Sequence, residues 1–129
     1  MSPYLLIAIG AIFGANARFL VSTWTANRIG VDFPYGTLLV NASGSCLMGL
    51  ALTLLAGRLG DGADARALLA TGFLGAYTTY STFAYETAAL IRQGSLRLAC
   101  VNALGGVATG IAGAAGGIAL GVWLGGHGG

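Results

Sequence analysis

The side chains that could do chemistry in this sequence are concentrated between residues 71 and 86. Five of them are serine or threonine residues with hydroxyl groups: Thr71, Thr78, Thr79, Ser81 and Thr82. Hydroxyl groups can turn to donate hydrogen bonds, so they suit a small anion. Tyr80 and Phe83 are three residues apart and project from one face of a helix. Aromatic ring edges carry positive partial charge and can face an anion, although the two rings could also simply be packing residues.

The residue types do not support an enzyme. Glu86 has no partner acid, and no nucleophile and base or metal-ligand cluster accompanies it. Cys46 and Cys100 lie in apolar runs, which predicts packing residues rather than a disulfide or a metal site. His127 lies in a glycine-rich tail, where we expect a flexible terminus. The net charge of +2 is scattered, whereas nucleic-acid binding needs a clustered basic face. We therefore expect neither catalysis nor a nucleic-acid partner.

A second group of polar side chains lies within apolar stretches. Thr37, Asn41 and Ser45 are four residues apart and share one face of a helix. They could bond to a neighbouring helix or form the wall of a polar pathway. Asn16 and Arg18 interrupt another apolar stretch, and polar residues in such places are costly. Arg18 is too deep for an ordinary loop charge, although its side chain could extend to a membrane interface.

The elements that must position these residues are membrane-spanning helices. Of the 129 residues, 56% are hydrophobic and 8% are charged, and the mean hydropathy is +0.80. Soluble domains carry about 25% charged residues, so a lipid bilayer must cover most of this surface. A span needs about 20 apolar residues, and four stretches provide them: residues 3–25, 36–56, 67–91 and 96–124. We expect one all-α membrane domain over residues 1–129, with short connectors at 26–35, 57–66 and 92–95.

The third stretch is predicted to be a broken helix. Backbone that crosses lipid must satisfy its own hydrogen bonds, so all four stretches should be helical. Between residues 71 and 86, however, β-branched residues and two glycines, Gly72 and Gly75, weaken the helix. Non-helical backbone in mid-membrane must line a cavity or bind an ion. Broken helices offer carbonyl oxygens to cations and amide groups to anions.

Glycine spacing predicts how the helices pack. Three glycine pairs in the last stretch are four residues apart: Gly106–Gly110, Gly113–Gly117 and Gly117–Gly121. Such spacing lets helix backbones approach closely in a membrane. Four helices enclose little by themselves, so we expect an oligomer.

The arginines of the connectors predict only a weak preference for one orientation in the membrane. Three lie on one side of the membrane, at Arg28, Arg92 and Arg97, and two on the other, at Arg58 and Arg66. By the positive-inside rule, the side with more arginines tends to face the cytoplasm. A difference of one arginine is small enough to permit insertion in both orientations. An antiparallel dimer is then possible. A single, weakly set orientation is the alternative.

Three segments resemble a known family. They are Gly14-Ala15-x-x-Arg18-Phe19, Gly36-Thr37-Leu38-x-Val40-Asn41 and Gly72-Phe73-Leu74-Gly75-x-x-Thr78-Thr79-Tyr80-Ser81-Thr82-Phe83. Over all four stretches the chain resembles the small fluoride channels, also called CrcB or Fluc proteins. The resemblance implies a multi-pass protein of the bacterial plasma (inner) membrane. It also implies an antiparallel, dual-topology homodimer with two pores along the subunit interfaces.

The resemblance assigns roles to individual residues. It implies a structural sodium ion at the dimer centre, held by backbone carbonyls of Gly75 and Thr78. The pore asparagine corresponds to Asn41, and the aromatics whose ring edges face fluoride correspond to Tyr80 and Phe83. Ser81 and Thr82 would form a polar track beside them. Thr37, on the face of Asn41, and Arg18 complete the predicted ion pathway; Arg18, near one end of its span, could raise the anion concentration in a vestibule.

Two features depart from the family pattern. The first aromatic is usually phenylalanine, and here it is Tyr80. The last helix often carries hydroxyl or tyrosine side chains toward the pore, whereas this chain offers Asn102, Thr109 and glycines.

The predicted function is passive export of cytoplasmic fluoride through a fluoride-selective channel. In acidic surroundings HF enters the cell and dissociates, and the trapped anion leaves. The chief alternative is a small multidrug or cation exporter with four helices, whose class has an essential glutamate in its first span. The first stretch here contains Asn16 and Arg18 and no acid. A membrane scaffold without transport activity is a third possibility.

Overall fold

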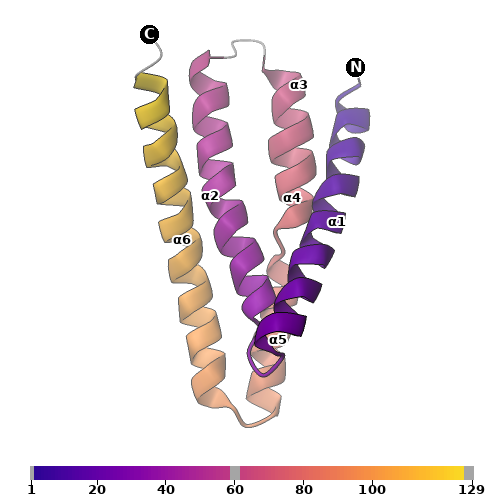
Figure 1. Ribbon diagram of the computed structural model, residues 1–129, viewed down its shortest axis with the longest axis vertical. Coiled ribbons are helices and arrows are strands. Elements are labelled where there is room, and N and C mark those ends of the chain that lie inside the picture. The colour runs from indigo at the N-terminus through magenta and orange to yellow at the C-terminus, as the bar shows by residue number, and fades with distance from the viewer. Residues whose placement is uncertain (1, 59–61, 127–129) are drawn as a thin grey trace.

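The computed structural model describes residues 2–58 and 62–126, and these form helices and short connections without strands. The elements are α1 (Pro3–Ile29), α2 (Tyr35–Arg58), α3 (Ala63–Ala65), the π-helical segment η1 (Arg66–Leu74), α4 (Gly75–Tyr77), α5 (Tyr80–Arg92) and α6 (Leu96–Gly126). The helices lie roughly along one axis (Figure 1). The predicted all-α class is confirmed. The expectation for His127 and part of the predicted 57–66 connector lie outside the described residues.

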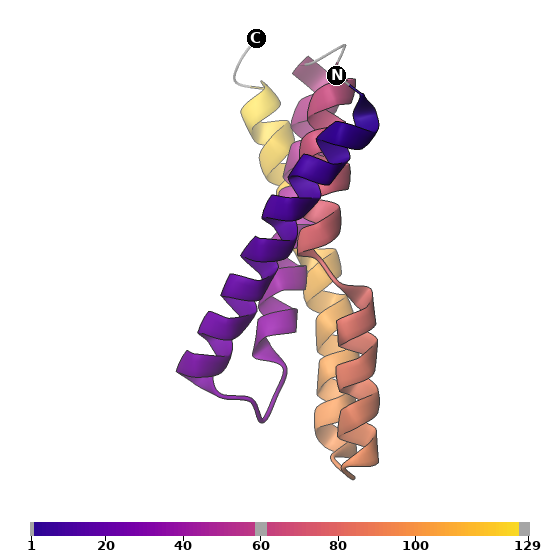
Figure 2. The same ribbon diagram turned by 90° about the vertical axis from the view of Figure 1, so that its right-hand side faces the viewer.

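Three helices, α1, α2 and α6, are long and apolar enough to cross a membrane, with mean hydropathies of 1.7 to 1.8. The remaining predicted span is divided among α3, η1, α4 and α5, and each of these is too short to cross a bilayer alone. Figure 2 shows that α3 to α4 occupy one half of the molecule's length and α5 the other. Together they run as far as a full span.

The first helix is longer than its predicted span. It continues from Thr25 to Ile29 because the residues between them include neither glycine nor proline. It ends at Gly30, whose φ of 111° favours glycine over any residue with a side chain. Residues 30–34 alone therefore connect α1 to α2. Phe33 in this connection is buried and its ring lies 4.9 Å from that of Tyr35.

Glycines bring α6 against α2 in the most extensive helix contact of the fold. A Cβ at Gly117 would collide with the carbonyl oxygen of Cys46, and one at Gly113 would lie 2.6 Å from that of Ala42. A Cβ at Gly121 would lie 2.7 Å from Cβ of Thr53 in α2 and 3.4 Å from the carbonyl oxygen of Leu50. The prediction that these glycines permit close backbone approach is confirmed. The Gly106–Gly110 pair differs, because neither glycine meets backbone of another helix.

The first helix packs on η1 in the same way. A Cβ at Gly10 would collide with the carbonyl oxygen of Leu68 and lie 2.7 Å from the amide nitrogen of Phe73. From the other side, a Cβ at Gly72 would lie 2.7 Å from the carbonyl oxygen of Ile7. This contact holds the first half of the third stretch against α1.

The connections lie at the two ends of the bundle. The start of α1, the end of α2, the start of α3 and the end of α6 are together at one end (Figure 1). Residues 30–34 and 93–95 lie at the other end, where α1 diverges from α5 and α6 (Figure 2). Because α5 stays beside α6 while α3 to α4 stay beside α1, the third stretch passes from one neighbour to another partway along the bundle.

Candidate functional site

The third stretch leaves helical geometry at two residues. Thr78 has a ψ of 158°, and Thr79 has a φ of −151° and a ψ of 114°. The next helix, α5, begins at Tyr80, and Oγ1 of Thr79 accepts a hydrogen bond of 3.3 Å from the amide group of Thr82. This contact is an N-cap, which satisfies an amide group that a helix start leaves without a helical partner. Two consecutive β-branched residues favour extended backbone at this point.

Asn41 of α2 bonds to both backbone groups of Thr79. Its Nδ2 donates to the carbonyl oxygen at 2.9 Å, and its Oδ1 accepts from the amide group at 2.8 Å. The side chain therefore supplies the donor and the acceptor that a continuous helix would have supplied. An asparagine amide nitrogen has a second hydrogen, which can still donate to another group.

The break frees carbonyl groups at the end of α4. In a continuous helix the amide group of Thr79 would donate to the carbonyl of Gly75, but it donates to Asn41 instead. The carbonyl of Thr78 accepts a long hydrogen bond, 3.4 Å, from Nη1 of Arg18. Carbonyl oxygens at a helix C-terminus carry partial negative charge and suit a hard cation. The carbonyls of Gly75 and Thr78 are groups that could hold a cation, and the guanidinium of Arg18 already donates to that of Thr78.

The sequence suggested that Arg18 lies near one end of its span. In the structure its side chain lies beside the break. Because α1 extends to Ile29, Arg18 is well inside the helix and its guanidinium reaches the carbonyl of Thr78. The role predicted for Arg18 in a vestibule stays a prediction. The side chain places positive charge next to the carbonyls freed by the break.

Tyr80 and Phe83 line an open groove among α2, the break, α5 and α6. The groove has a volume of about 590 Å³ and also contains Asn41 and Thr78, with mostly apolar side chains on its remaining walls. The ring centroids of Tyr80 and Phe83 are 6.0 Å apart, with planes at 48°. Tyr80 is 80% exposed, whereas Phe83 is partly buried against Gly106.

Ser81 and Thr82 gather around Thr79 and do not line the groove. Oγ1 of Thr79 donates to Oγ1 of Thr82 at 3.0 Å and lies 3.4 Å from Oγ of Ser81. Both Ser81 and Thr82 are exposed. The structure thus places three hydroxyl groups at the start of α5, next to the aromatic pair.

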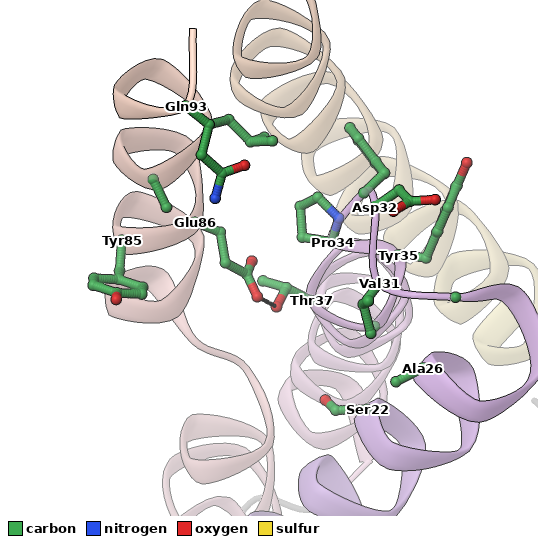
Figure 3. Close-up of a pocket in the computed structure, with 15 residues that line it drawn as sticks. Ser22, Ala26, Val31, Asp32, Pro34, Tyr35, Thr37, Tyr85, Glu86 and Gln93 are labelled. Carbon is green, nitrogen blue, oxygen red and sulfur yellow. Dashed lines mark hydrogen bonds between the residues drawn. The ribbon is translucent and has the colours of Figure 1, made fainter. Parts of the chain in front are cut away.

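A second cavity, of about 260 Å³, lies between the α1–α2 connection and α5. Figure 3 shows one wall from the connection and the start of α2, including Asp32, Pro34 and Tyr35, and the other from α5, including Tyr85, Glu86 and Gln93. Oγ1 of Thr37 donates to Oε1 of Glu86 at 2.8 Å. Oε2 of Glu86 is buried without a hydrogen-bond partner among the described residues.

The predicted polar face of α2 is therefore divided between two cavities. Thr37 faces the cavity of Glu86, while Asn41 and Ser45 face the groove. Sequence reasoning noted Glu86 only as an acid without a partner acid. Its hydroxyl partner is 49 residues away, and no local spacing could have indicated it.

The sequence was compared with models of known protein families. Residues 5–118 match the family model described as CrcB-like protein, camphor resistance. The chain belongs to the CrcB-like family. The family resemblance inferred from the three sequence segments is thereby confirmed.

Named members of the CrcB-like family cover nearly the whole chain. The protein is 47% identical over 109 residues to the fluoride-specific ion channel FluC of Solibacter usitatus, covering 84% of this chain and 89% of the relative. It is 41% identical over 126 residues to FluC of Chloroflexus aurantiacus, covering 98% and 100%. It is 46% identical over 108 residues to FluC 2 of Moorella thermoacetica, covering 84% and 87%.

Membership of this family supports two of the predictions made from the sequence. The relatives and the span-length helices together show a multi-pass bacterial membrane protein. The CrcB-like family is one of ion channels, so the prediction of a transport protein and not an enzyme is confirmed.

Proposed function

We propose that this protein is a fluoride-selective channel through which cytoplasmic fluoride leaves the cell passively. The observation that carries the proposal is the 41% identity to a fluoride-specific ion channel over 98% of this chain. The groove with its polar break supports it, because it brings hydrogen-bond donors and aromatic edges together with mostly apolar walls.

The residues in the groove and at the start of α5 beside it have the chemistry that such a pathway requires. Fluoride is small and strongly hydrated, so the pore must replace water with closely packed donors. The second amide hydrogen of Asn41 and the hydroxyl groups of Ser81 and Thr82 are such donors, and Phe83 and Tyr80 contribute ring edges. None of these groups carries a fixed charge, which favours exit as well as binding.

We also propose that the working unit is an antiparallel dimer. Tyr80 is 80% exposed, and the groove beside it is open. A second copy would cover the groove and close a pathway along the subunit interface. The difference of one arginine between the two sides of the bundle supports insertion in both orientations.

A structural sodium ion between the two copies belongs to the same proposal. The carbonyls of Gly75 and Thr78 from each copy would hold it. Gly75 is exposed and has lost its helical donor, which supports this assignment. When bound, the ion would attract the carbonyl oxygens of both copies and so hold the two subunits together. The guanidinium of Arg18 shares the carbonyl of Thr78 and would orient it.

Fluoride efflux from liposomes tests the proposed function. Vesicles loaded with potassium fluoride and containing the purified protein should release fluoride when valinomycin balances the charge, as read by a fluoride electrode. Chloride-loaded vesicles of the same preparation should release little chloride. Absence of fluoride efflux from folded protein would contradict the proposal, and proton-coupled uptake of an organic cation instead would identify a multidrug exporter.

A further inference from the structure

The last two helices face each other in a fixed antiparallel register next to the groove. Thr87 of α5 contacts Asn102 of α6, and Phe83 contacts Gly106. A step of four residues along each helix leads from one pair to the other. Residues four apart lie on one face of a helix, so both contacts belong to the same interface.

The first pair forms a hydrogen-bond chain that ends on the backbone of Phe83. Nδ2 of Asn102 donates to Oγ1 of Thr87 at 2.9 Å, and this hydroxyl donates to the carbonyl oxygen of Phe83 at 2.8 Å. Asn102 is 1% exposed, and its Oδ1 is buried without a partner among the described residues. Such an oxygen lowers stability, and an apolar side chain of similar size would avoid the cost. Stability alone therefore does not account for an amide at this position.

In the second pair, the ring of Phe83 packs against Gly106. A Cβ at Gly106 would lie 2.6 Å from Cε2 and 3.3 Å from Cδ2 of that ring. Any side chain at position 106 would therefore require the ring to shift. The hydroxyl group on this part of α6 does not serve the groove, because Oγ1 of Thr109 donates to the carbonyl oxygen of Gly105 at 2.7 Å.

We propose that Asn102, Thr87 and Gly106 are positioning residues for Phe83. On this view α6 contributes to the ion pathway by fixing the place of an aromatic edge, without offering polar groups of its own. The hydrogen-bond chain sets the register and rotation of α5 against α6, and Gly106 leaves the space that the ring fills. This inference rests on the proposed function, in which Phe83 faces the anion.

The position of the ring can be measured without transport. Phe83 is replaced by para-fluorophenylalanine, and the fluorine NMR signal is recorded in detergent for the otherwise native chain and for the variants Thr87→Val, Thr87→Ser and Asn102→Leu. Valine has the shape of threonine without the hydroxyl group, whereas serine keeps the hydroxyl. We expect the signal to shift or broaden in Thr87→Val and Asn102→Leu and to keep its position in Thr87→Ser. An unchanged signal in both disrupted variants would overturn the proposal.

Flux through the unlabelled variants tests whether the position matters. Thr87→Val should lower fluoride efflux about fivefold, which corresponds to the loss of one net hydrogen bond of about 1 kcal/mol, and Thr87→Ser should restore it. Asn102→Leu should lower efflux without lowering the melting temperature, which a purely structural role would not predict. A shifted signal with undiminished efflux would refute the inference and leave the channel function standing. No efflux from the unaltered protein would instead refute the channel function, while the NMR signal would still decide whether these residues hold the ring.

Discussion

At the residue scale, Asn41 combines a structural contact with a candidate role in the ion pathway. Its amide group satisfies the carbonyl and the amide of Thr79, a residue that is only 8% exposed. A buried polar backbone group without a partner costs about 1 to 3 kcal/mol, so this contact stabilises the extended backbone of the break. One amide hydrogen of Asn41 is left for an anion.

Asn41→Asp should stop fluoride efflux while the dimer stays assembled. The carboxylate can still accept from the amide group of Thr79, but it cannot donate to the carbonyl and it repels an anion. The measurement is efflux from liposomes, with size-exclusion chromatography in detergent to check assembly. Asn16→Ala is a suitable control, because Asn16 is exposed and bonds to the carbonyl of Ile12 in its own helix. Near-normal efflux through folded Asn41→Asp would remove Asn41 from the pathway.

Tyr80 and Phe83 should respond differently to substitution. Tyr80→Phe removes a hydroxyl group but keeps the ring edge, so substantial fluoride efflux should remain. Phe83→Ile removes the edge without adding polarity, and most of the efflux should disappear. Both variants must first be shown to form dimers by cross-linking, since misfolding would imitate a blocked pore. If Phe83→Ile conducts as well as the unaltered protein, the aromatic pair is only packing.

At the element scale, backbone-to-backbone contact through glycine holds the bundle together. Membrane helices gain little from the hydrophobic effect, so close packing must replace it. The contact of α2 with α6 supports one side of the groove, and that of α1 with η1 fixes the part of the third stretch before the break. The break thus lies between two rigidly packed segments.

Gly117→Ala should lower the stability of the protein. The new Cβ would collide with the carbonyl oxygen of Cys46, and such overpacking costs about 1 to 3 kcal/mol. Gly116→Ala is the matched control, because nothing lies within 4 Å of the Cβ it would add. Its stability should be unchanged or slightly raised, since alanine favours a helix more than glycine does. Thermal unfolding in detergent measures both, and equal melting temperatures would show that the close contact is not needed.

At the scale of the whole molecule, the groove and the exposed aromatic beside it favour a partner. Large apolar side chains are exposed on every long helix, as expected of a surface that faces lipid. Tyr80 stands apart from them, since it borders the polar break. Covering this region with a second copy would enclose donors that a single chain leaves open.

Two lysines added within residues 92–95, on the side that already has three arginines, should lock one orientation and abolish transport. The difference of one arginine would become a clear bias, and only parallel chains would then meet in the membrane. Co-expression with a copy biased the other way should restore fluoride resistance in cells that lack their own exporter. A single biased variant with full activity would rule out the antiparallel dimer.

Removal of sodium should weaken the dimer or slow efflux without changing which ion permeates. A cation held by Gly75 and Thr78 would lie between the subunits and apart from both anion pathways. Efflux and cross-linking are compared in sodium-containing buffer and in buffer with N-methylglucamine instead. A change in the ratio of fluoride to chloride efflux, or no change in either measurement, would contradict a structural ion at this place.

The sequence by itself determined the class of the protein, the approximate spans, the family and the region where helix is weak. Hydropathy and helix propensity are local properties, so four apolar stretches and the threonines and glycines between residues 71 and 86 were sufficient. Only the tertiary structure decided which residues meet. Asn41 and Thr79 are 38 residues apart, and Arg18 and Thr78 are 60 apart. Such pairs depend on the rotation and register of packed helices, which the close glycine contacts set and no local pattern encodes.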